Sequence, residues 1–237
     1  MLMSSSERIP LMKRSIFWLV ILIMIAGATY IYEKDLFSNG LEAITVSTNG
    51  KKLPIYRVNT DKPMVALSFD AAWGNEDTQK ILDILKKYKI NVTFFMTGGW
   101  VESYPDDVKA IKAAGHDLGN HSEHHKHMPQ LSNSSICDEL NSVTEKVEKL
   151  TNTKMCLFRP PYGDYNNTLI ESANALGYHV VQWSVDSLDW KDYGAENQVK
   201  QMLQTHTLRD GEILRFHAEG ENTGEMVSLL HPQLKEE

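Results

Sequence analysis

The chain is poor in cysteine and contains only Cys137 and Cys156 among its 237 residues. Two thiols are too few for a disulfide-rich scaffold, and no C-x-x-C pair is present to hold a structural metal. If the domain lies outside the cytoplasm the two thiols are free to pair, but their geometry decides this. We expect two separate and mostly buried thiols.

Positive charge is also scarce. The chain holds 24 Lys and Arg against 31 Asp and Glu, a formal net charge of -7. One acidic and three basic residues give the first 32 positions a charge of +2, which leaves -9 on the remainder. An acidic domain repels phosphate backbones, so we expect no nucleic-acid partner.

Long apolar runs are absent except at residues 15–32, which carry no charge and directly follow Lys13 and Arg14. A helix of this length spans about 27 Å at about 1.5 Å per residue, enough to cross a bilayer. The basic flank predicts a cytoplasmic segment 1–14, a transmembrane signal-anchor 15–32 and an extracytoplasmic remainder. The alternative is a secreted protein, cleaved as a signal peptide at Ala26-Gly27-Ala28.

The rest of the chain divides into a connector, residues 33–62, and one domain, residues 63–237. Within the connector, 43–47 and 55–58 are typical of short strands. In the domain, six strand-like runs alternate with helical apolar stripes: 65–69, 92–96, 116–119, 155–158, 179–183 and 212–216. Strands that alternate with crossover helices predict a parallel α/β fold, either a barrel or a doubly wound sheet.

Polar side chains follow five of these predicted strands: Asp70, then His121 and His125, then Arg159, then Asp186 and Asp189, and finally His217. Any one of them has a simple structural explanation. Asp70 is able to cap the next helix, Arg159 to brace a loop, and Asp189 to pair with Lys191. In a parallel barrel, however, all five positions meet at the carboxyl end of the strands, where barrel enzymes place their sites.

The chemistry of this set favours metal-assisted hydrolysis. His121 and His125, four residues apart, are able to bind one divalent ion if their segment is helical or tightly turned. Asp70 is placed to deprotonate a water, and Arg159 to hold Asp70 ionised. His217, partnered by Asp189, is placed to give a proton to a leaving amine.

Five ordered motifs resemble those of the polysaccharide deacetylases, the NodB-homology carbohydrate esterases of family four. They are 65–70, His121-Ser122-x-x-His125, Arg159-Pro160-Pro161-Tyr162-Gly163, Asp186-x-x-Asp189-Trp190 and Leu214-x-x-His217. The resemblance spans about residues 62–223. The version Phe69-Asp70-Ala71-Ala72-Trp73-Gly74 is similar to a membrane-anchored branch associated with sporulation in Firmicutes.

The resemblance implies a distorted (β/α) barrel that removes N-acetyl groups from aminosugar polymers such as peptidoglycan or chitin, with zinc, cobalt or nickel as cofactor. It makes Asp70 the base, Arg159 its partner, His217 the acid and Asp189 the residue that tunes it. His121 and His125 would bind the metal. Trp190 and Leu214 would line the acetyl pocket, and the backbone N–H near Tyr162 would help to stabilise the oxyanion.

Four features depart from the family pattern. Ala71 stands where a second Asp binds the metal, and Lys126 stands where a proline follows the second histidine. Only twenty residues follow His217, so barrel closure is expected to be short or supplied differently. Arg215 places a charge inside an apolar strand.

These departures leave three hypotheses. The first is an active metal-dependent deacetylase in which Asp70, Asp77, Glu76 or water completes the metal shell. The second is an impaired relative that binds cell-wall glycan or a partner at the membrane surface. The third keeps the chemistry but acts on another amide, such as a cyclic imide.

Overall fold

The computed structural model describes residues 42–43, 50–191, 193–205 and 208–234. The chain divides into two units, Met1–Glu42 and Ala43–Glu237, and the account below concerns the second. Among the described helices, none combines the length and the apolar character needed to cross a bilayer. The predicted membrane segment, residues 15–32, lies outside the described residues, and it stays a prediction.

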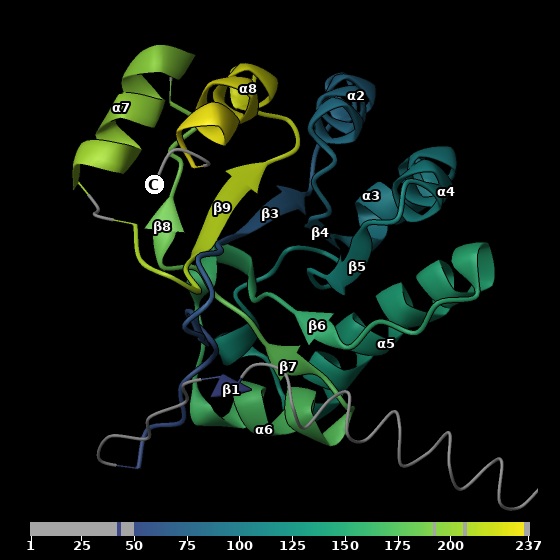
Figure 1. Cartoon of the computed structure of the whole chain (residues 1–237). Coiled ribbons are helices and arrows are strands. Elements are labelled where there is room, and N and C mark those ends of the chain that lie inside the picture. The colour runs from purple at the N-terminus through teal and green to yellow at the C-terminus, as the bar shows by residue number, and fades with distance from the viewer. Residues whose placement is uncertain (1–41, 44–49, 192, 206–207, 235–237) are drawn as a thin grey trace, which may run out of the picture. The chain divides into compact units, whose positions relative to one another are not determined.

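The second unit is built on a seven-stranded parallel sheet in the order β7-β6-β5-β4-β3-β9-β8 (Figure 1). Its strands are β3 (Ala66–Ala71), β4 (Thr93–Met96), β5 (Asp117–Asn120), β6 (Leu157–Phe158), β7 (His179–Val180), β8 (Val185–Asp186) and β9 (Ile213–His217). Two further short strands, β1 (Glu42–Ala43) and β2 (Val58–Asn59), lie outside this sheet. All six predicted strands of the domain are present, and β8 is a further strand that the sequence did not predict.

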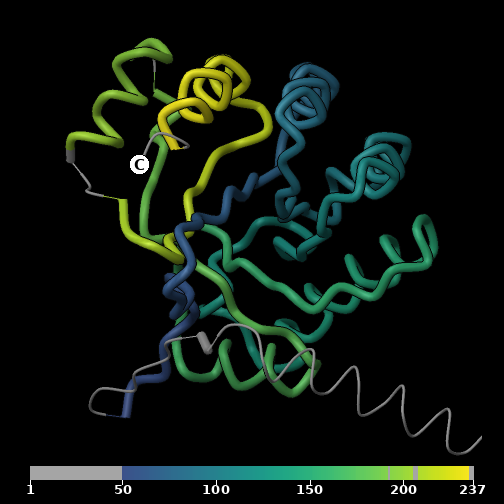
Figure 2. Tube along the Cα trace, viewed as in Figure 1, coloured from purple at the N-terminus to yellow at the C-terminus, as the bar shows by residue number. Residues whose placement is uncertain are grey.

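The sheet is curled, because its two edge strands are joined by a very short segment. Only residues 181–184 connect β7 at one edge to β8 at the other, as the tube in Figure 2 shows. At about 3.6 Å per residue, this segment holds the edges within roughly 18 Å of each other. The fold is therefore a curled parallel half-barrel and not a doubly wound sheet. The predicted parallel α/β class is confirmed, and the distorted barrel that the resemblance implied is present as a half-barrel.

Residues 55–58 bridge the gap between the two ends of the curled sheet. Ile55 forms a parallel bridge with Val181, and Arg57 forms an antiparallel bridge with Glu212 at the start of β9. One short segment therefore hydrogen-bonds to both sides of the gap. It coincides with the strand predicted at 55–58.

Helices surround the sheet on its outer side (Figure 1). They are α2 (Thr78–Tyr88), α3 (Gly98–Ser103), α4 (Pro105–Ala113), α5 (Asn133–Thr151), α6 (Asn167–Ala175), α7 (Ala195–Thr205) and α8 (Thr223–Gln233), with 3-10 turns η1 (Met128–Gln130) and η2 (Pro161–Gly163). The apolar stripes predicted α2, α5 and α6, and Gly177 follows α6 with a positive φ of 87°. After β9, the described chain continues as α8 and adds no further strand.

Alternation along the central strand β3 separates core from site. Phe69 is fully buried and stacks on Phe94 of β4 and Phe216 of β9, with ring centroids 5.1 and 5.5 Å away. Its neighbours Ser68 and Asp70 are buried polar residues that contact Arg159 inside the half-barrel. Side chains on one face of β3 therefore pack in the hydrophobic core, and those on the other face contact the polar residues of the site.

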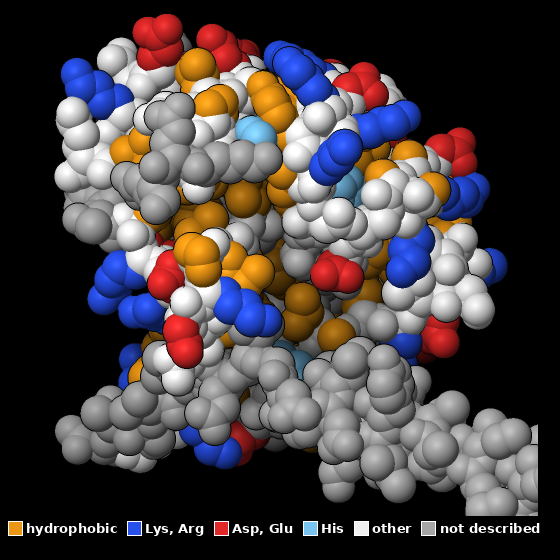
Figure 3. All heavy atoms as spheres, in the orientation of Figure 1, with side chains coloured by type: hydrophobic (Ala, Val, Ile, Leu, Met, Phe, Trp, Pro, Cys, Tyr) orange, Lys and Arg blue, Asp and Glu red, His pale blue; other side chains and the backbone are white. Residues whose placement is uncertain are grey.

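The surface bears charges of both signs. In the face drawn in Figure 3, Lys and Arg side chains alternate with Asp and Glu, and no extended basic patch is visible. The expectation that the protein has no nucleic-acid partner stays a prediction. Both cysteines are free, as predicted, but the expectation of buried thiols is wrong for Cys156, which is exposed.

Replacing Phe69 by Ala should lower the free energy of unfolding by about 3–5 kcal/mol, because it removes the ring between two others and leaves a cavity. Urea unfolding followed by circular dichroism measures this loss. Met64, which is 50% exposed, is the control, since its change to Ala should cost no more than about 0.5 kcal/mol. Equal losses for the two variants would contradict the central position of Phe69.

Candidate active site

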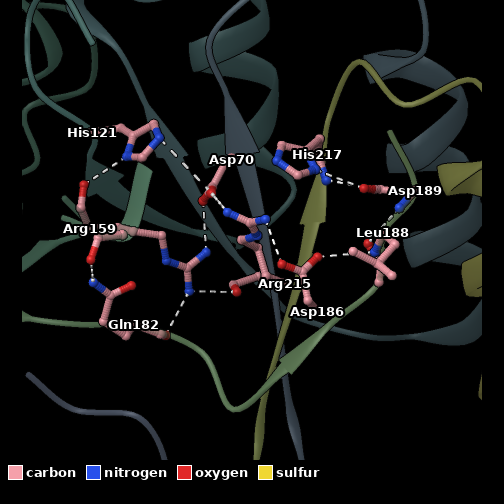
Figure 4. Close-up of polar contacts among 12 residues, drawn as sticks. Asp70, His121, Arg159, Gln182, Asp186, Leu188, Asp189, Arg215 and His217 are labelled. Carbon is pink, nitrogen blue, oxygen red and sulfur yellow. Dashed lines mark hydrogen bonds and ion pairs between the residues drawn. The ribbon is translucent and has the colours of Figure 1, made fainter. Parts of the chain in front are cut away.

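Asp70 and Arg159 form a buried ion pair at the carboxyl end of the strands (Figure 4). Arg159 Nη1 donates to Asp70 Oδ1 at 2.7 Å. The second oxygen, Oδ2, lies 4.0 Å from His121 Nε2 and 4.0 Å from Arg215 Nη1. One oxygen of the carboxylate is thus anchored, while the other faces the remaining groups of the site.

The remaining contacts of Arg159 fix its position. Nη2 donates to Ser68 Oγ at 2.8 Å and to the Gln182 carbonyl at 3.1 Å, and the guanidinium lies 4.1 Å from the centroid of the Phe95 ring. Burial by itself raises the pKa of Asp70, but the nearby positive charges, of which Arg159 contributes the most, together outweigh burial and lower the pKa to about 2. Asp70 is therefore a carboxylate at neutral pH.

His217 and Asp189 form the second pair. Asp189 is buried, and its Oδ1 lies 2.7 Å from His217 Nδ1. Its Oδ2 accepts from the His217 backbone N–H at 2.7 Å and from Thr223 Oγ1 at 2.6 Å. Burial opposes the charged imidazole, but the hydrogen bond and the charge of Asp189 outweigh it and raise the pKa of His217.

The two pairs face the same space because β3 and β9 are neighbours. Asp70 and His217 are direct partners in the parallel register of these strands. A carboxylate and an imidazole whose pKa is raised therefore stand side by side at the mouth. The sequence placed both groups at strand ends, and the structure brings them together.

His121 and His125 lie on a tight turn after β5, in which Ser122 and His125 have positive φ values of 66° and 53°. Their ring centroids are 4.9 Å apart. His121 Nδ1 lies 2.7 Å from the Arg159 carbonyl and must donate to it, which leaves Nε2 as an acceptor facing Asp70. Burial lowers the pKa of both imidazoles, that of His125 to about 4, so both are neutral.

These two imidazoles suit a divalent metal, but the third ligand is missing. His125 Nδ1 is buried without a hydrogen-bond partner among the described residues. At the position of the expected Asp, the Ala71 methyl group is fully buried in the main core cluster. The described residues contain no group of three His, Cys, Asp or Glu side chains able to hold a metal ion. Within the described part of the chain, the metal site is therefore incomplete.

Asp77 and Glu76, the two acidic residues considered as replacements for the missing metal ligand, contact groups outside the site. Asp77 precedes α2 and lies 3.9 Å from Lys80, while Glu76 accepts from the Asn75 backbone N–H. Neither side chain lines the cavity. Lys126 is 2.8 Å from Glu139, a carboxylate that also contacts His124, so its charge is paired with Glu139.

A cavity of about 960 Å³ opens over the site and contains Asp70, His121, His125 and His217 in its lining. Tyr162 and Trp190 also line it, as their predicted binding roles require. Leu214 does not. Because side chains alternate along β9, Leu214 lies fully buried in the outer core beside Phe216. The prediction that Leu214 lines the acetyl pocket is corrected accordingly.

Arg215 and Glu219 are charged residues of the cavity lining that were not among the predicted site residues, as are Lys191 and Glu221. Arg215 Nη2 donates to Asp186 Oδ2 at 2.6 Å, and its guanidinium lies 3.8 Å from the Trp183 ring centroid. Its unusual charge within an apolar strand was the signal that could have identified it. Glu219 has a buried Oε2 without a described partner, and burial raises its pKa to about 7. No motif pointed to Glu219.

Comparison with known proteins agrees with this geometry. The family model described as polysaccharide deacetylase matches residues 57–181. The chain is 34% identical over 190 residues to the peptidoglycan-N-acetylmuramic acid deacetylase PdaA of Bacillus subtilis, covering 77% of this chain and 70% of PdaA. The chain belongs to the polysaccharide deacetylase family.

Two further relatives are informative. The chain is 33% identical over 207 residues to the uncharacterized protein YlxY of Bacillus subtilis, covering 86% of this chain and 63% of YlxY. The structure matches BA3943 of Bacillus anthracis, a CE4 family pseudoenzyme, with a TM-score of 0.74 and 34% identity, covering 78% of this chain and 64% of that one. A BA3943 mutant has restored enzymatic activity. The chain spans less than two thirds of YlxY and of BA3943.

Replacing Asp189 by Asn should lower the pKa of His217, because the imidazolium loses its carboxylate. We expect the wild-type pKa to lie above the ordinary value of about 6.5 and the variant pKa to lie below the wild-type one. Histidine NMR titration measures both. Equal pKa values would show that Asp189 does not tune His217.

The raised pKa of His217 also makes the free energy of unfolding depend on pH, which gives a second test of the His217–Asp189 pair. A raised pKa in the folded state means that the stabilisation is complete below the unfolded pKa and is lost as the pH rises through the folded pKa. The stability difference between wild type and Asp189→Asn should therefore shrink with rising pH across that window. Urea unfolding at several pH values measures it.

Replacing Ala71 by Asp should increase zinc affinity about tenfold or more, since it offers a third ligand beside two neutral imidazoles. Isothermal titration calorimetry with zinc measures the change. Ala71→Asn is the matched control, because it has a similar size but no charge, and thermal melting checks that both variants fold. Equal affinities in wild type and Ala71→Asp would show that position 71 does not reach the metal.

Proposed function

We propose that the protein hydrolyses the N-acetyl group of aminosugars in a cell-wall glycan, either peptidoglycan or a chitin-like polymer, at a rate limited by the missing metal ligand. One observation carries the proposal. The ionised Asp70 and the proton-carrying His217 are register partners on adjacent strands and open into one cavity. The likeness to PdaA, which is named for deacetylating N-acetylmuramic acid in peptidoglycan, supports the choice of substrate.

Amide hydrolysis needs two proton transfers, and Asp70 and His217 each perform one of them. Asp70 accepts a proton from the water that attacks the acetyl carbonyl, while Arg159 keeps the carboxylate aimed. His217 gives its proton to the amine as the C–N bond breaks, which releases acetate and a free aminosugar. Asp189 holds the imidazole in the orientation that this transfer needs.

The proposed location follows from the apolar run at residues 15–32. A single-pass anchor with a cytoplasmic N-terminus would place the domain outside the cell membrane, where the glycan is, and a secreted form would do the same. A role in sporulation is part of the proposal only through the likeness of the motif around Asp70 to that branch of the family.

A second candidate is a glycan-binding protein that has lost hydrolysis. The observation that favours it is Ala71, which removes one ligand from the expected metal set. The likeness to BA3943, described as a pseudoenzyme, supports it further. In this case the cavity would bind N-acetylated glycan without releasing acetate.

Acetate release from N-acetylated peptidoglycan and from chitooligosaccharides, with zinc, cobalt or nickel added in turn, distinguishes the two candidates. We expect slow release by the wild type and faster release by Ala71→Asp. Asp70→Asn should reduce the wild-type rate by about 10²–10⁴, the usual contribution of a general base. Thermal melting of each variant verifies folding.

Each outcome has a defined meaning. Release by Ala71→Asp alone would favour the glycan-binding candidate, because the groups other than the ligand would then be competent. A rate unaffected by Asp70→Asn would exclude Asp70 as the base. Release from small cyclic imides, with none from glycans, would favour the third hypothesis of another amide substrate.

A further inference from the structure

Trp73 is an exposed aromatic residue to which neither the motifs nor the mechanism assigns a role. Its exposed fraction is 59%, the same as that of Trp190, and these two are the most exposed large hydrophobic residues in the described part of the chain. Both line the cavity of about 960 Å³. An exposed indole retains apolar surface that a binding partner is able to cover.

The loop that carries Trp73 is held firmly in place. Trp100 Nε1 donates to the Gly74 carbonyl at 2.6 Å, and Asn75 Nδ2 donates to Asp107 Oδ2 at 2.7 Å. Gly74 has a positive φ of 52°, and a Cβ there would lie 2.5 Å from Glu76 Oε2. The exposure of Trp73 is therefore set by a braced backbone.

The ring of Trp73 has one recorded aromatic contact, edge-on with His125 at a centroid distance of 4.9 Å and an interplanar angle of 64°. This contact holds the indole near the imidazole pair and leaves much of its surface to solvent. A rigid aromatic side chain loses little conformational entropy on binding, which is why Trp residues dominate many recognition sites.

Trp73 and Trp190 lie on loops on either side of the acid. Trp73 follows Asp70 and β3, and Trp190 follows Asp189 and β8, while β9, which ends at His217, lies between these strands. The cavity volume is at the upper end of the range of about 300–1,000 Å³ for small-molecule sites, so it accommodates more than one sugar ring. The indoles thus bracket the reacting position along an extended site.

Glu219 adds a polar contact to the same cavity. Its Oε2 is buried and has no hydrogen-bond partner among the described residues. Because this oxygen is closed to solvent, Glu219 makes the cavity wall polar but offers no free acceptor there. The exposed aromatic faces match a carbohydrate, which presents flat C–H faces.

We infer that Trp73 forms a separate subsite that stacks on a sugar ring adjacent to the one whose acetyl group faces Asp70 and His217, so that the protein recognises an extended N-acetylated chain rather than a single sugar. This inference rests on the proposed function. Trp73 then binds the neighbouring sugar and makes the affinity depend on chain length, while Tyr162 and Trp190 contact the reacting sugar.

The test measures the affinity of the full chain for N-acetylglucosamine oligomers of one to five units by titration calorimetry. We expect wild-type affinity to rise with oligomer length. Trp73→Ala should reduce affinity for the longest oligomer about tenfold, equivalent to about 1.4 kcal/mol, and leave the monomer affinity unchanged. Trp73→Phe, which keeps an aromatic face, should retain most of the gain.

Tyr56→Ala provides the matched control, because Tyr56 is an exposed aromatic residue outside the cavity lining. It should leave the length dependence intact. Wild-type binding that does not change with length, or an unchanged gain in Trp73→Ala, would overturn the subsite while leaving the proposed function standing. Absence of binding at every length would count against the proposed function itself and the subsite with it.

Discussion

The site depends on one fully buried guanidinium. Arg159 holds Asp70 through Nη1, Ser68 and the Gln182 carbonyl through Nη2, and His121 through its own backbone carbonyl. A charge without solvent is costly unless it is paired and hydrogen-bonded, and removal of one partner leaves the other uncompensated. Asp70 and His121 are thus oriented by the same residue, and neither is expected to keep its geometry without Arg159.

Curvature of the sheet explains why residues from distant parts of the chain meet. The short link between the edge strands curls the sheet, and residues 55–58 hydrogen-bond across the gap. Side chains that alternate inward along β3 and β9 then converge, whereas those that alternate outward meet the helices. Asp70, Arg215 and His217 share the inner space for this reason, while Phe69, Leu214 and Phe216 form the core.

The two ion pairs and the expected metal ligands depend on different positions of the chain. Asp70 and His217 each contact a buried counter-charge, supplied by Arg159 and Asp189. At position 71, where the resemblance led us to expect a metal ligand, a methyl group is packed in the core. The described residues therefore hold both ion pairs but no set of three metal ligands.

The sequence by itself determined the alternation of strands and helices, and with it the parallel α/β class. It also determined the five polar groups at strand ends, because strand-end position follows from local pattern and needs no tertiary information. The absence of a ligand at Ala71 was readable for the same reason. Membership in the family followed from the order of those motifs.

Tertiary structure alone decided which side chains share a space. The inward position of Arg215, the core position of Leu214, the pairing of Lys126 with Glu139 and the unsatisfied oxygen of Glu219 all depend on register, curvature and packing. These are relations between segments distant in sequence, and a local pattern carries no information about them. The sequence shows which residues form a strand, but the neighbouring strands and helices decide what each side chain faces.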